Sequence, residues 1–274
     1  MASLRRLLRH LNPAQLRFHP FEALAFVTGW LWNAGILRRA EYQLRPRSAR
    51  FPVTLRRGTS DPLVFVQVFV LKEYGAVDDL RDVATVLDCG ANVGYSAAYF
   101  LSRFPAARLI AVEPDPGNFN LLARNLAPYG ERATALCAAV WSHSGRLMPN
   151  EQPYRDGREW AHQVRESHAG ETGSIAALDL PSLIDQTRAT RISLLKMDIE
   201  GAEAVVLAAE PERWLGRIDA LAIELHDDSQ FGPATPVFRR AIGEHRFAVS
   251  SRGELTICRR LPEKPPAKAL ADSP

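Results

Sequence analysis

Short runs of apolar residues alternate with amphipathic segments along the chain from about residue 60 onward. The runs have the length of buried strands, whereas the segments between them have the apolar spacing of helices. The predicted strands are Thr85–Cys89, Arg108–Val112, Ala133–Val140, Ile192–Met197, Ala220–Leu225, Phe247–Ser250 and Leu255–Cys258. The predicted helices occupy residues 94–103, 116–127, 201–209 and 234–245. This alternation predicts an α/β domain built on a mostly parallel sheet that is covered on both faces.

The alternation is interrupted once and is absent from both ends of the chain. Residues 141–178 are rich in glycine, proline and polar residues, which predicts hairpins or loops inserted into the sheet. Residues 262–274 hold four prolines and no periodicity, so we expect a disordered tail. We therefore predict an N-terminal appendage over residues 1–57, a main domain over residues 58–261 that contains the insertion, and the tail.

The N-terminal region is basic and partly apolar. Residues 1–60 hold eleven arginines and two glutamates, a net charge of +9, and the whole chain carries +3, which leaves −6 on residues 61–274. The most apolar stretch, residues 23–37, is shorter than the roughly 20 residues that span a membrane. Its apolar circumference favours a helix packed on the main domain, with an interfacial helix as the alternative. We expect a cytoplasmic protein, in which peripheral contact with the inner membrane surface through residues 17–39 is the alternative.

Charge and cysteine usage argue against two kinds of protein. An acidic main domain is the opposite of the basic surface that a nucleic-acid-binding domain presents, so we expect no nucleic-acid partner. The three cysteines, Cys89, Cys137 and Cys258, are odd in number and lack CxxC spacing. They indicate neither a disulfide framework nor a zinc site, and we predict no bound metal.

The sharpest local signal is the sequence VLDCGANVGYSA at residues 86–97, a strand that enters a turn with Gly90 and Gly94. Glycines at such a turn let a ligand approach the backbone. Glu113 ends the next predicted strand, 19 residues after Gly94, where a carboxylate can accept hydrogen bonds from both hydroxyls of a ribose. The turn lacks GxGxxG spacing, and Asp88 would repel a pyrophosphate. A nucleoside cofactor with a cationic sulfonium therefore fits this turn better than a dinucleotide.

With these motifs the chain resembles the FkbM family of class I S-adenosylmethionine-dependent methyltransferases. The resemblance covers about residues 58–250 and rests on GTSDPLVFVQVFVLKEY (58–74), VLDCGANVGYSA (86–97), AVEPDPGNFNLLARNL (111–126), LDLPSLI (178–184), LLKMDIEGAEAVVL (194–207) and LAIELH (221–226). It implies a Rossmann-like sheet, mostly parallel with an antiparallel last strand, that binds S-adenosyl-L-methionine. It also implies O-methylation of a hydroxyl on a carbohydrate or secondary metabolite.

The same resemblance implies which residues bind the cofactor. Glu113 would hold the ribose, and Ala138 would lie near the adenine. The methionyl and ribose side would be lined by Asp88, Gly90, Ala91, Asn92 and Gly94.

Four residues near the carboxyl ends of the fourth and fifth predicted strands are candidates for the chemistry. Methyl transfer to a hydroxyl needs in-line geometry and a base. Lys196 and Asp198 share a face by the two-residue period, and Asp198 stands where ligands bind in α/β sheets. Glu200 follows at a predicted helix start, where stabilisation of the helix dipole explains it equally well. His226 ends the fifth strand and has the pKa range of a general base.

Two other functions remain open at this stage. Asp198, His226 and Asp227 resemble the strand-end ligands of catechol-type methyltransferases, which use a divalent metal. A nucleotide-binding Rossmann oxidoreductase is compatible with the sheet, although the glycine spacing disfavours it. Our leading prediction is a metal-independent O-methyltransferase whose partner is a small-molecule or carbohydrate acceptor.

Overall fold

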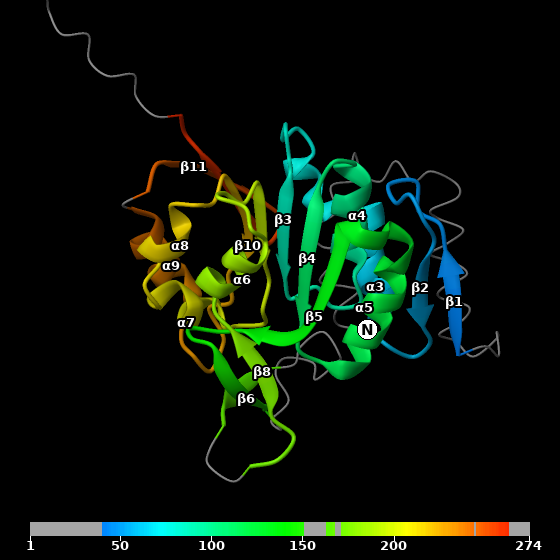
Figure 1. The fold of residues 1–274 in the computed structure, drawn as a ribbon, viewed down its shortest axis with the longest axis horizontal. Coiled ribbons are helices and arrows are strands. Elements are labelled where there is room, and N and C mark those ends of the chain that lie inside the picture. The colour runs from blue at the N-terminus through cyan, green and yellow to red at the C-terminus, as the bar shows by residue number, and fades with distance from the viewer. Residues whose placement is uncertain (1–39, 151–162, 168–170, 244, 263–274) are drawn as a thin grey trace, which may run out of the picture.

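The computed structural model describes residues 40–150, 163–167, 171–243 and 245–262. Among these residues, ten strands form one sheet in the order β11-β12-β10-β9-β3-β4-β5-β8-β6-β7 (Figure 1). The parallel centre consists of β10 (Ala220–Glu224), β9 (Leu194–Met197), β3 (Thr85–Cys89), β4 (Arg108–Glu113) and β5 (Ala133–Val140). The last strand, β12 (Leu255–Arg260), runs antiparallel to both β10 and β11 (Phe247–Arg252). The predicted α/β class and the antiparallel last strand are confirmed.

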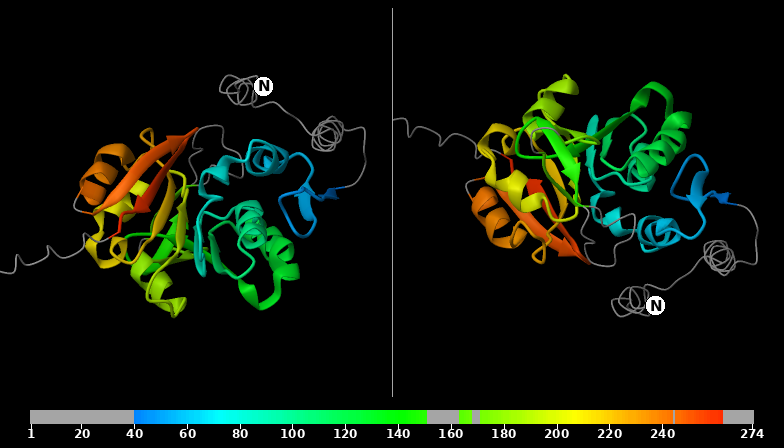
Figure 2. Two further views of the ribbon diagram at one scale, coloured as in Figure 1. Left: turned by 90° about the horizontal axis from the view of Figure 1, so that it is seen from above. Right: turned by 90° about the horizontal axis from the view of Figure 1, so that it is seen from below.

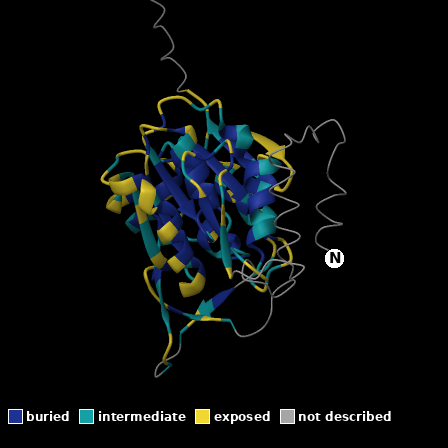
Figure 3. Cartoon of the chain, turned by 90° about the vertical axis from the view of Figure 1, so that its right-hand side faces the viewer, coloured by how far each residue is buried: buried dark blue, intermediate teal, exposed yellow. Residues whose placement is uncertain are grey.

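Helices cover both faces of the sheet, because successive residues of the central strands are apolar and point to opposite sides. Val86 of β3 packs in the core that contains helices α3 (Asp61–Phe65), α4 (Tyr95–Arg103) and α5 (Pro116–Leu126). Its neighbours Leu87 and Cys89 pack in the opposite core. That second core contains helices α6 (Leu180–Gln186), α7 (Glu203–Ala208), α8 (Glu212–Leu215) and α9 (Ala234–Gly243). Figure 3 shows the buried residues gathered in the central strands and the helix surfaces that contact them.

The seven predicted strands and four predicted helices all form, each within two residues of its expected ends. Sequence periodicity missed the short helices α3, α6 and α8. It also missed two segments after α3, a π-helical turn (Val66–Val70) and a 3₁₀ turn (Glu73–Val77), and a second 3₁₀ segment (Ala127–Arg132) after α5. These pieces have too few turns to show a helical apolar period.

The predicted helical appendage is wrong for residues 40–57, its described part. Here β1 (Glu41–Leu44) and β2 (Val53–Arg56) form an antiparallel hairpin. Val53 and Leu55 of β2 are fully buried in the core that contains α3, α4 and α5, so the hairpin belongs to the main domain. Figure 2 shows this hairpin at the opposite end of the molecule from β11 and β12. The apolar stretch and residues 17–39 lie outside the described residues, as does nearly all of the predicted disordered tail.

The insertion extends the sheet beyond β5. Its described parts are β6 (Gly145–Pro149), β7 (Val164–Glu166) and β8 (Ile175–Leu178). β8 pairs in parallel with the end of β5, and β6 runs antiparallel to both β8 and β7. The hairpins expected between residues 141 and 178 are therefore strands of the main sheet. No helix in the described part of the chain has the length and apolarity needed to cross a membrane.

Candidate functional site

The predicted site residues meet at the carboxyl ends of β3, β4, β9 and β10, which are neighbours in the sheet. Asp88 of β3 stands beside Lys196 of β9 in the strand register. The backbone amide of Asp198 donates a hydrogen bond of 3.1 Å to the carbonyl of Cys89, which joins the two strand ends. In a parallel sheet this edge is where ligands bind.

The glycine turn after β3 is packed directly against the end of β9. Gly90 has a φ of 77°, and a Cβ there would lie 1.7 Å from the carbonyl oxygen of Asp198. Only glycine combines that dihedral angle with that approach. The amides of Gly90 and Ala91 donate to the carbonyl of Val112 on β4, so the turn is fixed to both neighbouring strands. Gly94 follows with a φ of 87° and begins α4.

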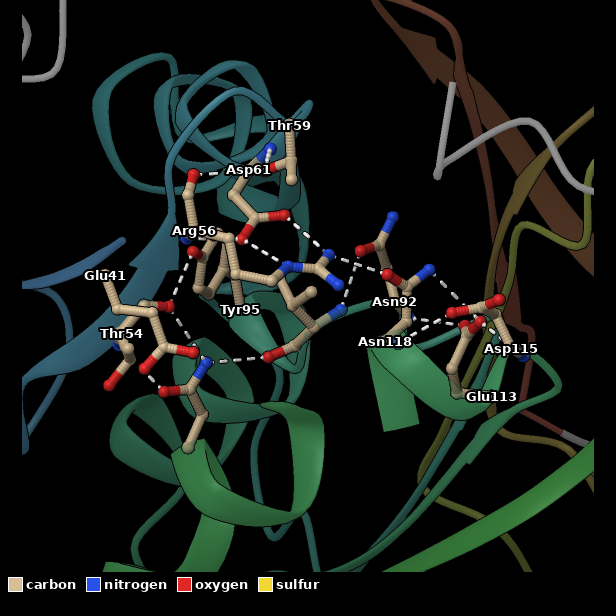
Figure 4. A network of polar contacts seen from close by, with 12 residues as sticks. Glu41, Thr54, Arg56, Thr59, Asp61, Asn92, Tyr95, Glu113, Asp115 and Asn118 are labelled. Atoms are coloured by element: carbon tan, nitrogen blue, oxygen red, sulfur yellow. Dashed lines mark hydrogen bonds and ion pairs between the residues drawn. The ribbon is translucent and has the colours of Figure 1, made fainter. Parts of the chain in front are cut away.

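Glu113 and the glycine turn are in direct contact, as their spacing predicted. The amide of Asn92 donates a hydrogen bond of 2.8 Å to Oε2 of Glu113, and the amide of Asp115 donates one of 3.0 Å to Oε1. Asn118 adds a longer contact of 3.4 Å (Figure 4). Glu113 is buried, and burial raises its pKa to about 7 although these donors act in the opposite direction.

A polar network connects Glu113 to the N-terminal hairpin. Arg56 at the end of β2 forms an ion pair of 2.8 Å with the fully buried Asp61 and donates a hydrogen bond of 2.7 Å to Oδ1 of Asn118. The amide nitrogen of Asn118 in turn contacts Glu113 (Figure 4). Sequence analysis missed this network because it placed Arg56 in the appendage.

Lys196 is buried at the centre of the site. Its Nζ donates hydrogen bonds to the carbonyls of Gly90 (2.6 Å) and Cys89 (3.3 Å), and lies 3.5 Å from Asp88 and 3.7 Å from Asp198. Burial opposes its charge, but the two carboxylates outweigh burial and raise the pKa of Lys196 above its usual value. Lys196 therefore stays protonated and holds the turn against β9, which favours a positioning role over proton transfer.

Asp88 is also fully buried. It accepts a hydrogen bond of 2.6 Å from Ser96 besides its contact with Lys196. Burial raises its pKa, although Lys196 acts in the opposite direction. Asp88 thus stabilises the turn through Ser96 on α4 and through Lys196, which donates a hydrogen bond to the carbonyl of Gly90.

Four carboxylates surround His226, which is 1 % exposed. Its Nδ1 lies 3.0 Å from Oε1 of Glu203, and its Nε2 lies 3.4 Å from Glu224, 3.8 Å from Glu200 and 4.0 Å from Asp198. Burial opposes a charge on the imidazole, but Glu203 and Glu224 raise the pKa of His226 to about 11. A protonated imidazole cannot accept a proton, so this arrangement does not favour His226 as the base.

The turn between β9 and α7 replaces the helix start that was expected at residue 201. Glu200 and Gly201 have φ values of 52° and 99°, and α7 begins only at Glu203. A Cβ on Gly201 would lie 2.4 Å from Cβ of Ser229, and Gln163 from the insertion donates a hydrogen bond of 2.9 Å to the carbonyl of Glu200. Glu200 is therefore outside the helix, and stabilisation of a helix dipole does not explain it.

Three acids near the site, Glu73, Glu203 and Glu224, are not among the residues that the sequence assigned to it. Glu224 lies two residues before His226, so the strand period that related Lys196 to Asp198 could have identified it. Glu73 begins the 3₁₀ turn that follows α3, and burial together with the charges of Glu224 and Asp198 raises its pKa to about 8. Its place at the site depends on a distant segment, and no local pattern shows it.

Asp227 lies differently from its sequence prediction, whereas the place predicted for Ala138 near the adenine stays a prediction. Asp227 is exposed, and its Oδ1 accepts a hydrogen bond of 2.7 Å from the amide of Thr235 near the start of α9, so it lies apart from the carboxylates around His226. The catechol-type ligand set that included Asp227 is therefore not assembled. Ala138 is buried in the core, whereas its neighbour Cys137 is exposed and pairs with Glu113 in the strand register.

The glycine turn, the buried strand-end acid Glu113 and the carboxylates around His226 thus lie together at the carboxyl edge of this sheet. Residues 88–253 match the model of the methyltransferase FkbM domain. The chain therefore belongs to this family, and it is a methyltransferase of the S-adenosylmethionine-dependent class. This finding favours methyl transfer over the oxidoreductase alternative.

Several known proteins are similar to the chain. Methyltransferase sdnD of Sordaria araneosa is 27% identical over 200 residues, which are 60% of this chain and 77% of that protein. The 2-O-methyltransferase NoeI of Sinorhizobium fredii is 27% identical over 182 residues, 62% of this chain and 72% of that protein. The AMB antimetabolite synthetase AmbE of Pseudomonas aeruginosa is 27% identical over 233 residues, 71% of this chain but only 11% of that protein. A solved magnesium protoporphyrin IX methyltransferase from Synechocystis PCC 6803 covers 72% of this chain and 84% of its own, with 12% identity and a TM-score of 0.39.

Proposed function

We propose that the chain transfers a methyl group from S-adenosyl-L-methionine to a hydroxyl oxygen of a carbohydrate or a related hydroxylated metabolite. One observation carries the proposal: the turn of Asn92 is hydrogen-bonded to the strand-end Glu113 while its other side is packed against Asp198. The acid that we propose for the ribose and a group of carboxylates thus lie at one edge of the sheet. The similarity to a 2-O-methyltransferase supports a hydroxyl acceptor.

The cofactor would lie over the turn after β3. Glu113 would accept hydrogen bonds from the ribose hydroxyls, and Gly90, Ala91, Asn92 and Gly94 would present backbone to the ribose and methionyl groups. Asp88 would hold the turn in place without contacting the cofactor, because its carboxylate already pairs with Lys196 and accepts a hydrogen bond from Ser96. The adenine would lie near the end of β5, where Ala138 contributes backbone and the exposed Cys137 flanks Glu113.

The reaction is a displacement at the methyl carbon. The hydroxyl oxygen forms a bond to that carbon as the carbon–sulfur bond breaks, and the electron pair of the broken bond stays on sulfur, giving S-adenosylhomocysteine. The hydroxyl proton passes to a carboxylate at the site. Asp198 and Glu200, whose side chains are 26% and 22% exposed, are the acids that an acceptor can reach.

The first test is calorimetric binding of S-adenosylhomocysteine. We expect micromolar binding by the natural chain and at least a tenfold loss for Glu113→Ala. Glu131→Ala is the matched control, because Glu131 is an exposed acid away from the turn. Equal affinity of the two variants would contradict the ribose assignment.

The second test identifies the acceptor. Transfer of a labelled methyl group into separated polysaccharide, lipid and small-molecule pools should label hydroxylated carbohydrates or metabolites. Asp198→Asn should abolish that labelling while it leaves S-adenosylhomocysteine binding within about threefold, which is under 1 kcal/mol. Methylation that occurs only on nitrogen or carbon would refute the proposed O-methylation.

A further inference from the structure

We propose that Asp198, Glu224 and His226 bind a divalent metal ion, and that the acceptor hydroxyl coordinates this ion during methyl transfer. The ion-binding part of the proposal stands alone, and its role in transfer rests on the proposed function. This ligand set differs from the one that the sequence suggested, because the third ligand is Glu224 and not Asp227.

The three side chains converge on one point. Each offers a ligand atom, and these atoms lie within 4.8 Å of one another. Nε2 of His226 is 3.4 Å from Oε1 of Glu224 and 4.0 Å from Oδ1 of Asp198. Two ligands about 2.1 Å from one ion lie about 3 Å apart when adjacent and about 4 Å apart when opposite. The observed separations therefore suit a common ion after small side-chain movements.

The buried imidazole points to a ligand independently of the acids. His226 is 1 % exposed, and its Nε2 makes no hydrogen bond with any described residue although three carboxylates lie within 4.0 Å. Oδ1 of Asp198 is also buried and likewise lacks a hydrogen bond to the described residues. Buried polar atoms in folded proteins are normally paired, so an ion between Nε2 and Oδ1 would satisfy both.

Glu203 orients the imidazole as a metal ligand requires. Its Oε1 lies 3.0 Å from Nδ1 of His226 and also accepts a hydrogen bond of 2.9 Å from the amide of Ile199. Glu203 thus lies on the Nδ1 side of the ring, while Nε2 is the nitrogen near Asp198 and Glu224. Metal-bound histidines commonly have such a carboxylate on the nitrogen that faces away from the metal.

The surrounding charge also favours a divalent cation. Besides the two ligand carboxylates, Glu203 and Glu200 lie 3.0 Å and 3.8 Å from the ring nitrogens of His226. Carboxylate oxygens suit magnesium and manganese, whereas imidazole suits transition metals. Manganese accepts both kinds of ligand, and we choose Mn²⁺ as the probe.

The ion would bind the acceptor and increase the acidity of its hydroxyl. A hydroxyl that coordinates a divalent cation loses its proton more readily than a free one. With Asp198 and Glu224 on the ion, Glu200 is the remaining partly exposed carboxylate that can receive the proton. A pair of neighbouring hydroxyls, as on a sugar, could coordinate the ion together.

The experiment measures Mn²⁺ binding by the full chain at pH 8 with electron paramagnetic resonance, which reports free Mn²⁺. We expect one ion per chain and at least a tenfold weaker affinity for Glu224→Gln and for Asp198→Asn. Asp227→Asn is the matched control, since this exposed neighbour is not a ligand and the amide can still accept the hydrogen bond from Thr235. It should bind Mn²⁺ like the natural chain.

A second measurement separates folding and cofactor binding from ion binding. S-adenosylhomocysteine affinity should stay within threefold in Glu224→Gln, which shows that the variant is folded, while Glu113→Ala should keep Mn²⁺ binding and lose S-adenosylhomocysteine. Methyl transfer should stop after chelation and return with Mn²⁺. No stoichiometric Mn²⁺ binding, or equal binding by Glu224→Gln and the natural chain, would overturn the ion site. If the natural chain binds Mn²⁺ but does not bind S-adenosylhomocysteine, the proposed function is overturned and the ion site is not.

Discussion

The protonation states of single residues at this site are set by the buried charges and hydrogen-bond partners around them. Lys196 keeps its charge in the interior because two carboxylates and two carbonyls surround its Nζ. In Glu113 the neutral form is favoured instead, because burial raises the pKa more than the hydrogen-bond donors lower it. These states follow from packing across strands. Sequence spacing identified the residues, but it could not show their protonation.

Because we propose that Glu113 binds the ribose, its raised pKa predicts that cofactor binding depends on pH. A carboxylate accepts hydrogen bonds from both ribose hydroxyls, whereas a protonated carboxyl must donate one of its own. Since the pKa is about 7, affinity for S-adenosylhomocysteine should fall by up to about tenfold per unit as the pH drops from 7 to 5.5. Calorimetric titrations between pH 5.5 and 8 measure this fall. Glu113→Gln should bind S-adenosylhomocysteine more weakly, and its affinity should vary less with pH. Parallel pH profiles for the variant and the natural chain would contradict the assignment of Glu113 to the ribose.

The raised pKa of Glu113 also makes folding depend on pH, but stability falls as the pH rises, whereas cofactor affinity should increase. The folded-state pKa of Glu113, about 7, exceeds its unfolded value of 4.5, so the folded chain holds the extra proton between these values. The contribution of Glu113 to the free energy of unfolding is therefore complete below pH 4.5 and is lost as the pH rises to 7. Ionisation of Glu113 thus lowers the free energy of unfolding above pH 7.

At the scale of elements, the hairpin is joined to the cofactor site through buried charge. Asp61 is fully buried and pairs with Arg56, which also holds Asn118 beside Glu113. Asp61→Asn would leave the Arg56 guanidinium without its carboxylate. We expect the free energy of unfolding to fall by about 3 kcal/mol and S-adenosylhomocysteine affinity to fall several-fold. Urea unfolding and calorimetry measure the two effects.

The control for this prediction is the exposed ion pair between Glu41 and Arg124, whose side chains are 38% and 56% exposed. Glu41→Gln removes a pair on the same hairpin and should cost under about 1 kcal/mol, with no change in cofactor affinity. Equal costs for the two substitutions would show that the buried network does not stabilise the site.

The elements that sequence predicted are those whose apolar period is long or continuous. The central strands read as unbroken apolar runs because helices cover both faces, and their ends were placed to within two residues. The hairpin and the strands of the insertion are three to five residues long and flanked by charged or turn-forming residues. Strands this short show no clear two-residue apolar period, and β8 pairs with β5, which precedes the insertion. Glu73 lies in a short 3₁₀ turn that likewise shows no period.

At the scale of the whole molecule, the boundary between the basic N-terminal region and the acidic remainder of the sequence does not coincide with a boundary in the structure. The acidic surplus of residues 61–274 includes the carboxylates gathered around His226. The basic N-terminal region, however, does not end where the main domain begins. Arg56 belongs to the polar network of the site, and β2 belongs to the core. The boundary predicted at residue 57 therefore cuts through packed structure.

This placement predicts different outcomes for two N-terminal deletions. Removal of residues 1–39 leaves every described strand and helix in the chain, so S-adenosylhomocysteine binding should persist within threefold. Removal of residues 1–57 also deletes Val53 and Leu55 from the core, at a cost of about 2–5 kcal/mol each, so the melting temperature should fall by more than about 10 °C. Thermal unfolding with and without S-adenosylhomocysteine compares them. Equal melting temperatures for both deletions would show that the hairpin is dispensable, and vesicle binding lost in the shorter deletion would assign residues 1–39 to a membrane surface.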